Sequence, residues 1–109
     1  MTTPLPYVLL ILAIVSEVIA TSALKASDGM SRLGPAAIVI VGYAVAFLLL
    51  SQTLKALPVG LTYAIWAGVG VVGVALVGVF VFDEIMTPMK VAGIALIILG
   101  VVLVQTSLA

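Results

Sequence analysis

The chain of 109 residues contains no cysteine and no histidine, and it has only four basic and four acidic residues. The side chains that most often bind zinc are therefore missing, and no disulfide can form. The formal net charge is zero, so the chain offers no basic patch for nucleic acid. We expect no metal, no cofactor and no nucleic-acid partner.

Charged residues make up 7% of the chain, whereas soluble domains usually carry about 25%. Hydrophobic residues make up 65%, and a globule of this size buries too little surface to enclose them. The apolar residues gather in four stretches of roughly 20 residues, the length that crosses a hydrocarbon core of about 30 Å. Backbone groups in lipid must pair within their own segment, which predicts helices. The stretches cover residues 5–24, 36–54, 59–82 and 91–108.

These stretches predict an all-α membrane protein with four transmembrane helices, forming a single transmembrane domain over residues 1–109. The first stretch lacks the basic start of a signal peptide, because the first charge is Glu17, so we count it as a true span. The polar breaks are too short to hold an active site, which argues against an enzyme. We expect a multi-pass protein of the cell inner (plasma) membrane, in contact with membrane lipid.

The charges in the breaks give a weak orientation signal. The first and third breaks share one side of the membrane and carry Lys25, Arg32 and Lys90. The second break carries Lys55, and the terminal amine lies on its side. An excess of Lys and Arg marks the cytoplasmic side. Two interpretations remain open: one orientation with both ends in the cytoplasm, or dual insertion, in which copies face both ways.

Glu17 is the one charged residue inside an apolar stretch, close to the middle of the first one. An acid at the centre of a membrane helix costs about 3 kcal/mol, and such residues usually serve a function and face protein or water. Spacings of three and four residues place Glu17 on one side of its helix. Its neighbours on that side are mostly small or hydroxylated, as in a cavity wall. They are Leu10, Ala13, Ala20 and Thr21.

Two roles remain for this carboxylate. Pairing with a base on another helix is excluded, because all four basic residues lie in the breaks. Glu17 could be a neutral, hydrogen-bonded residue that only holds helices together. Alternatively, it binds a proton and a cation in turn, because both compete for one negative charge. We favour the proton and cation site, with Thr21 facing the substrate.

Aromatic residues form one face of the third stretch, where Tyr63 and Trp66 are followed by Gly70. Aromatic rings attract cations, and the indole of Trp does so most strongly. The alternative is an aromatic belt at the membrane interface. Trp66 lies seven residues into its stretch, deeper than belt residues usually lie. We therefore predict that Trp66 and Tyr63 face a cationic substrate.

Glycines suggest where the helices bend and pair. Gly68 and Gly70 make the third helix easy to bend, and we predict a hinge there, although glycines that only permit close packing are an equal alternative. Gly93 and Gly100 lie a heptad apart in the fourth stretch. Small residues at such a spacing favour helix pairing in lipid, so we predict a dimer interface at these two glycines.

Taken together, the chain resembles the small multidrug resistance family of proton-coupled exporters, over nearly its whole length. The matching pieces, in chain order, are Ser16-Glu17-Val18-Ile19-Ala20-Thr21, Leu24-Lys25, Ser31-Arg32-Leu33, Pro58-Val59-Gly60, Tyr63-Ala64-Ile65-Trp66-Ala67-Gly68-Val69-Gly70 and the segment from Gly93 to Val101.

The resemblance implies an antiparallel dimer of four-helix protomers that exports lipophilic or quaternary ammonium cations in exchange for protons. It implies that Glu17 is the carboxylate shared by proton and substrate. It adds Tyr43 as a third substrate-facing aromatic beside Tyr63 and Trp66, and it makes Gly93 and Gly100 the dimerisation motif. Transporters usually obtain two facings from inverted repeats. No internal repeat is visible here, so two oppositely inserted copies would supply that symmetry.

Three alternatives stay open at this point. The family's guanidinium-exporting branch tends to carry Trp where this chain has Ala20, which favours the multidrug branch. Some members act only as one half of a heterodimer with a paralogue. A different class of protein, a non-transporting membrane assembly subunit, would use Glu17 only to hold helices together.

Overall fold

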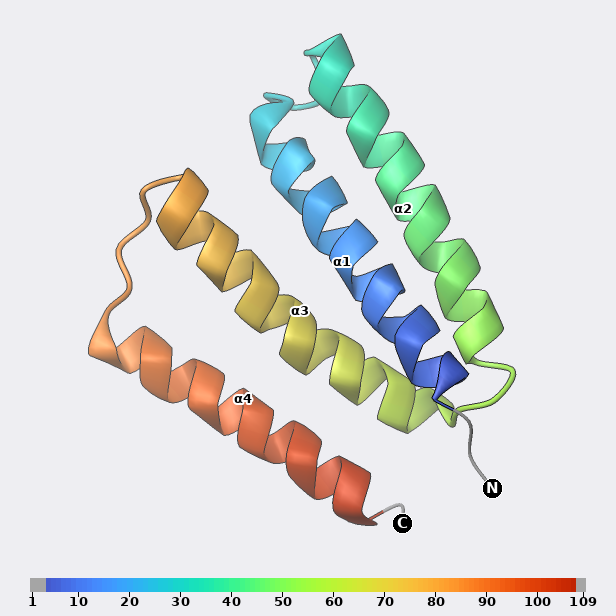
Figure 1. Ribbon diagram of the computed structural model, residues 1–109. Coiled ribbons are helices and arrows are strands. Elements are labelled where there is room, and N and C mark those ends of the chain that lie inside the picture. Colours follow the sequence, from blue (N-terminus) through green and yellow to red (C-terminus); the bar gives the residue numbers. More distant parts are fainter. Residues whose placement is uncertain (1–3, 108–109) are drawn as a thin grey trace. The chain divides into compact units, whose positions relative to one another are not determined.

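Four helices follow one another along the chain in the computed structural model, which describes residues 4–107 (Figure 1). They are α1 (Leu5–Ala26), α2 (Leu33–Thr53), α3 (Val59–Val81) and α4 (Pro88–Ser107). Each is long and apolar enough to cross a membrane. The predicted all-α membrane fold with four spans is therefore confirmed. The predicted end of the fourth helix at Leu108 lies outside the described residues.

Two helix starts differ from the sequence prediction, and proline explains both. The predicted start of α2 at residue 36 is wrong, because α2 begins at Leu33 and includes Pro35 in its first turn. The missing N–H of proline costs nothing there. The predicted start of α4 at residue 91 is also wrong. The Thr87 hydroxyl accepts a hydrogen bond from the Lys90 amide at 3.2 Å and caps a helix that begins at Pro88, a favoured first residue.

The corrected ends also move two lysines from the breaks into helices. Lys25 lies in the last turn of α1, where a cation is favoured by the helix dipole, and Lys90 lies in the first turn of α4. Glu17 remains the only charged residue of the described chain that is far from a helix end. The corrections therefore leave its exceptional position unchanged.

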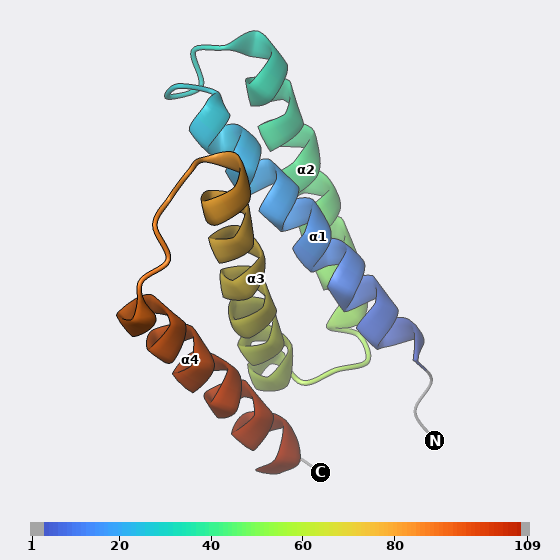
Figure 2. The same ribbon diagram turned by 60° about the vertical axis from the view of Figure 1, so that its left-hand side comes forward.

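The chain divides into two compact units, residues 1–57 and 58–109, and each is a helical hairpin in its described part. In the first hairpin, α1 and α2 run side by side in opposite directions (Figure 2). They approach closely at Gly42, where an added Cβ would lie 2.8 Å from the Cβ of Ala20. The Ser16 hydroxyl donates a hydrogen bond of 2.8 Å to the Gly42 carbonyl at the same level. Small residues and one interhelical hydrogen bond are the usual means of helix association in lipid.

The second hairpin consists of α3, α4 and the loop between them. Gly68 packs closely against α4, because an added Cβ would lie 2.5 Å from a γ-methyl of Val101. The end of α3 is fixed by the Gly78 carbonyl, which accepts hydrogen bonds from the amides of Phe82 and Glu84 at 3.2 and 2.9 Å. None of the described residues of α4 is fully buried within the chain.

Gly68→Ala tests whether this contact joins α3 to α4. The added methyl group meets a β-branched side chain whose χ1 is restricted in a helix, so α4 must move away. We expect a loss of about 1–3 kcal/mol, typical of overpacking, measured as a lower midpoint of thermal unfolding in detergent micelles.

Gly70→Ala is the matched control, because its Cβ would meet only the Trp66 ring at 4.0 Å. It should be neutral or stabilising by up to about 1 kcal/mol through helix propensity. Adding Val101→Ala to Gly68→Ala should restore the midpoint. If Gly68→Ala unfolds like Gly70→Ala, the contact does not hold the hairpin together.

Candidate functional site

Glu17 lies about 2 Å from the midpoint of α1, taking 1.5 Å of rise per residue. Its side chain is half-buried. The stripe predicted beside it is confirmed as an interior face, because Leu10, Ala13 and Ala20 are fully buried. A carboxylate at this depth is remote from both ends of its helix, so its partners must come from the helices themselves.

Two hydroxyl groups extend from this carboxylate in a line. Thr21, one turn further along α1, donates a hydrogen bond of 3.3 Å from its Oγ1 to Oε2 of Glu17. The same Oγ1 lies 2.6 Å from the Tyr43 hydroxyl on α2, and either oxygen can be the donor of that bond. The structure thus brings together Glu17, Thr21 and Tyr43, which the sequence pointed to separately. Tyr43 also stacks on Phe47, with ring centroids 6.4 Å apart.

The position of Tyr43 depends on a close contact between α1 and α2 that sequence reasoning missed. This contact, called the clasp below, consists of Ser16, Ala20 and Gly42. Gly42, its neighbour in the chain, packs against Ala20 and accepts the hydrogen bond of Ser16, which itself precedes Glu17. The clasp therefore fixes the register of α2 against α1 one residue away from Glu17 and Tyr43. The available signal was a glycine directly before Tyr43, in the middle of an apolar segment.

Tyr63 and Trp66 belong to α3, in the second hairpin. Tyr63 is 69% exposed within the chain, which leaves its ring available to another molecule, whereas Trp66 is half-buried. Thr62, next to Tyr63, is buried, and its hydroxyl has no hydrogen-bond partner within the part of the chain that the structure describes. Sequence reasoning did not single out Thr62. The substrate-facing roles of Tyr63 and Trp66 stay predictions.

The predicted hinge glycines differ in their surroundings. Gly68 packs against Val101, so it has a structural role in joining α3 to α4. Gly70 lies beside the Trp66 ring, with no other atom placed to meet an added Cβ. The helix continues through both residues, from Val59–Val81. A hinge at Gly68 and Gly70 stays a prediction, and close packing already accounts for Gly68.

The predicted interface glycines have no close neighbour in the described chain, and Gly93 lines a hollow between α3, the loop and α4. An added Cβ at Gly93 or Gly100 would meet no atom within 4 Å. The side chain of Val101 instead contacts α3. Both glycines therefore have space for a larger side chain, and the dimer interface itself stays a prediction.

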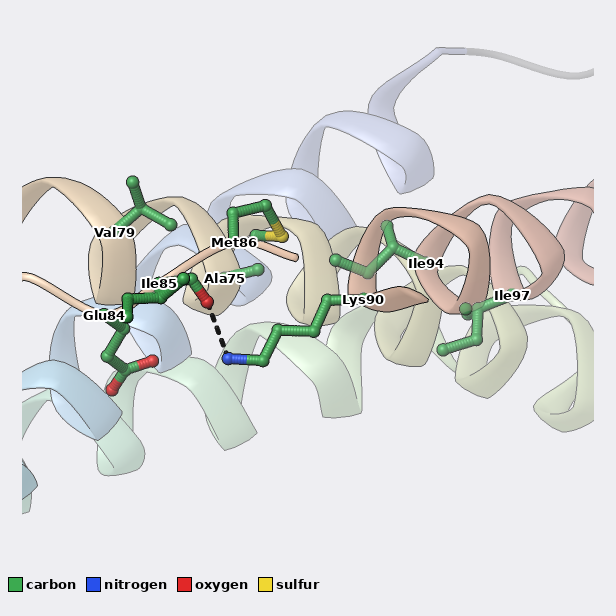
Figure 3. A pocket seen from close by; sticks show the side chains of 9 residues that line it. Ala75, Val79, Glu84, Ile85, Met86, Lys90, Ile94 and Ile97 are labelled. Carbon is green, nitrogen blue, oxygen red and sulfur yellow. Dashed lines mark hydrogen bonds between the residues drawn. The ribbon is translucent and has the colours of Figure 1, made fainter. Parts of the chain in front are cut away.

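A hollow of about 340 Å³ lies in the second hairpin, between α3, the loop and the start of α4 (Figure 3). Apolar side chains line it, among them Val79, Ile94 and Ile97, and Glu84 and Lys90 add charges of opposite sign. The Lys90 amino group donates a hydrogen bond of 2.7 Å to the Ile85 carbonyl. Glu84 is exposed beyond the end of α3, so water can solvate it, and it lacks the membrane depth of Glu17.

These observations define a class of protein: a small multi-pass helical membrane protein whose candidate binding side chains lie inside its membrane spans. The described residues contain no cluster of three or more side chains able to hold a metal ion. Among residues 4–107, the one site that combines charge, membrane depth and hydroxyl partners is that of Glu17, Thr21 and Tyr43.

Comparison with known proteins agrees with this class. A family model described as "Small Multidrug Resistance protein" matches residues 5–97. The quaternary ammonium compound-resistance protein QacE of Escherichia coli is 45% identical over 99 residues, which cover 91% of this chain and 90% of that protein. The multidrug resistance protein EbrA of Bacillus licheniformis is 43% identical over 101 residues, covering 93% of this chain and 96% of the relative. QacH of Staphylococcus saprophyticus, another quaternary ammonium compound-resistance protein, is 45% identical over 102 residues, covering 94% and 95%.

The chain belongs to the small multidrug resistance family. It is accordingly a multi-pass inner-membrane transporter and not an enzyme.

Proposed function

We propose that this protein is an antiporter that exports lipophilic and quaternary ammonium cations in exchange for protons, with Glu17 binding each in turn. The observation that carries the proposal is the position of Glu17, the only mid-span charge in the described chain, held beside two hydroxyl groups. The printed names of the relatives, which refer to quaternary ammonium compounds and multidrug resistance, support the substrate class.

Exchange follows from the cost of a bare charge in the membrane. An ionised acid at the centre of a span is disfavoured by about 3 kcal/mol, and either a proton or a monovalent cation removes the net charge. The site therefore favours the two loaded states over the empty one. Because proton and cation occupy the same carboxylate, loading one displaces the other, which couples cation export to proton uptake.

The surroundings of Ala20 support the multidrug branch over the guanidinium branch. Ala20 is fully buried, and its Cβ faces Gly42 at close range. The tryptophan that the guanidinium branch tends to carry at this position would need the space that α2 occupies. A site lined by small residues and accessible aromatic rings instead suits bulky apolar cations.

Two copies of the chain would complete the transporter. The four helices of one chain are too few both to enclose a site and to open it in turn to each side of the membrane. Two oppositely inserted copies would supply the inverted symmetry that transporters use. The spacing of Gly93 and Gly100 and the absence of close neighbours around them support a pairing surface, and the weak charge bias of the loops permits dual insertion. A homodimer is the simplest form, and pairing with a paralogue would use the same surface.

Glu17→Gln tests the shared carboxylate. In the native protein, cation affinity should fall as pH is lowered, because protons occupy the acid that the cation needs. Glu17→Gln keeps shape and hydrogen bonding but cannot titrate, so it should bind cations weakly and equally at every pH. Glu17→Asp should keep a pH-dependent affinity with a shifted midpoint. The measurement is equilibrium binding of tetraphenylphosphonium across pH in one lipid bilayer.

Glu84→Gln is the matched control, since Glu84 is the carboxylate of the hollow in the second hairpin. It should leave affinity and pH dependence unchanged. If Glu17→Gln and the native protein give the same curve, the antiport mechanism is wrong.

Trp66→Leu tests recognition by the aromatic face of α3. A desolvated cation–π contact is worth about 2 kcal/mol, so affinity for an aromatic cation should fall more than tenfold while folding is retained. Phe80→Leu removes an aromatic ring from an exposed position of the same helix and should change little. Near-native affinity of Trp66→Leu would assign Trp66 to packing.

Gly93→Ile tests the pairing surface of α4. The larger side chain should separate paired α4 helices and lower the dimer fraction, measured by cross-linking in lipid. Ala95→Ile is the control, because it adds a large side chain on nearly the opposite side of the same helix. Equal dimer fractions in the two variants would remove this surface from the interface.

A further inference from the structure

The Thr21 hydroxyl occupies the middle of the chain of hydrogen bonds that begins at Glu17. Its Oγ1 lies 3.3 Å from Oε2 of Glu17 and 2.6 Å from the Tyr43 hydroxyl. A hydroxyl group has one proton to donate, although it can accept on its oxygen. Thr21 can therefore donate to only one of these neighbours at a time. The direction of the whole chain depends on which neighbour needs that proton.

When Glu17 is ionised, the direction is fixed by its carboxylate, which can only accept hydrogen bonds. Thr21 then donates to Glu17, and the bond to Tyr43 must be donated by the Tyr43 hydroxyl. The Tyr43 proton is thereby engaged by Thr21. The Tyr43 oxygen then presents its lone pairs to its surroundings, and these lone pairs attract a cation.

When Glu17 is protonated, the direction reverses. The acid proton needs an acceptor, because a polar hydrogen left unpaired away from water is costly, and Thr21 Oγ1 is the acceptor in reach. Thr21 then turns its own proton to the Tyr43 oxygen, and the Tyr43 proton is released. Both hydroxyl groups only rotate, so no O–H bond of Thr21 or Tyr43 breaks. The one proton gained is that of Glu17, taken from water.

We propose that Thr21 is a positioning residue that transmits the protonation state of Glu17 to the Tyr43 hydroxyl. Tyr43 then presents an acceptor to the cation when Glu17 is ionised and a donor when Glu17 is protonated. This inference rests on the proposed antiport function and deepens it. Proton loading removes the negative charge and also turns a neighbouring cation-attracting group into a repelling one, so one proton changes the site at two positions.

Few other groups of α1 and α2 can bias this chain of hydrogen bonds, and the loop between the two helices adds only Asp28 and Arg32, seven and eleven residues beyond Thr21. No residue of α2 is charged, and Tyr43 is its only titratable side chain. On α1 the others are Tyr7, more than three turns before Thr21, and Lys25, one turn after it. Lysine side chains ordinarily stay charged in the pH range where carboxylates titrate. Glu17 is therefore the group whose titration sets the direction.

The test follows the NMR signal of the Tyr43 ring carbon that bears the hydroxyl, in the full-length protein in lipid, while pH is varied. In the native protein this signal should shift with the same midpoint as the side-chain carboxyl carbon of Glu17. Thr21→Val removes the hydroxyl at nearly constant shape. Glu17 should still titrate in that variant, and most of the Tyr43 shift should disappear. Thr21→Ser restores a hydroxyl and should restore the shift. The Tyr7 signal should not follow Glu17 in any variant.

A second readout links the chain of hydrogen bonds to binding. At a pH where Glu17 is ionised, Thr21→Val and Tyr43→Phe should each weaken tetraphenylphosphonium binding, because the Tyr43 lone pairs no longer face the cation, and we expect a loss of about tenfold, similar to that of a polar contact with a charged group. The double variant should bind the cation no more weakly than either single variant, because both changes interrupt the same chain of hydrogen bonds. A Tyr43 signal that ignores Glu17, or follows it equally in Thr21→Val, would overturn the inference. If protons and cations do not compete for Glu17 at any pH, the antiport proposal is overturned instead.

Discussion

A single carboxylate held at the middle of an apolar helix is the constraint on which the rest of the molecule depends. Water cannot solvate Glu17 at that depth as it solvates the charges at the helix ends, so the charge must be matched by a proton, a cation or oriented hydroxyl groups. Thr21 supplies the hydroxyl from the same helix, and Tyr43 extends the chain from the next. The remaining architecture keeps these groups in place without a second fixed charge.

The clasp between Ser16, Ala20 and Gly42 provides that support. Lipid offers no hydrophobic force to press two apolar helices together, so close backbone approach and an interhelical hydrogen bond must do so. The clasp lies beside Glu17 on α1 and beside Tyr43 on α2, which ties helix packing to the geometry of the site. The α3–α4 hairpin has a similar close contact, in which a γ-methyl group of Val101 packs against Gly68 without an interhelical hydrogen bond at this glycine. Each hairpin thus has a close contact between its two helices at a glycine.

Sequence reasoning predicted the number of spans, the class of fold and the mid-span position of Glu17, because each rests on composition or on a charge that stands alone. It placed Thr21 correctly beside Glu17, since helical spacing fixes neighbours within one helix. The contacts of Gly42 and Gly68 could not be predicted, because all faces of a membrane helix are apolar and the pattern does not reveal which face meets which partner. The starts of α2 and α4 were misplaced, since proline marks both a break and a first turn. The Thr62 hydroxyl, buried without a partner in the described chain, gave no signal in the sequence.

Proton release on cation binding tests the central claim most directly. The purified protein in lipid nanodiscs, in a weakly buffered solution at a pH where Glu17 holds its proton, would receive tetraphenylphosphonium while the solution pH is recorded. The account predicts that protons are released as the cation binds, that the release declines as the starting pH is raised, and that Glu17→Gln releases none. Saturable cation binding without proton release at any pH, or equal release from Glu17→Gln, would contradict it.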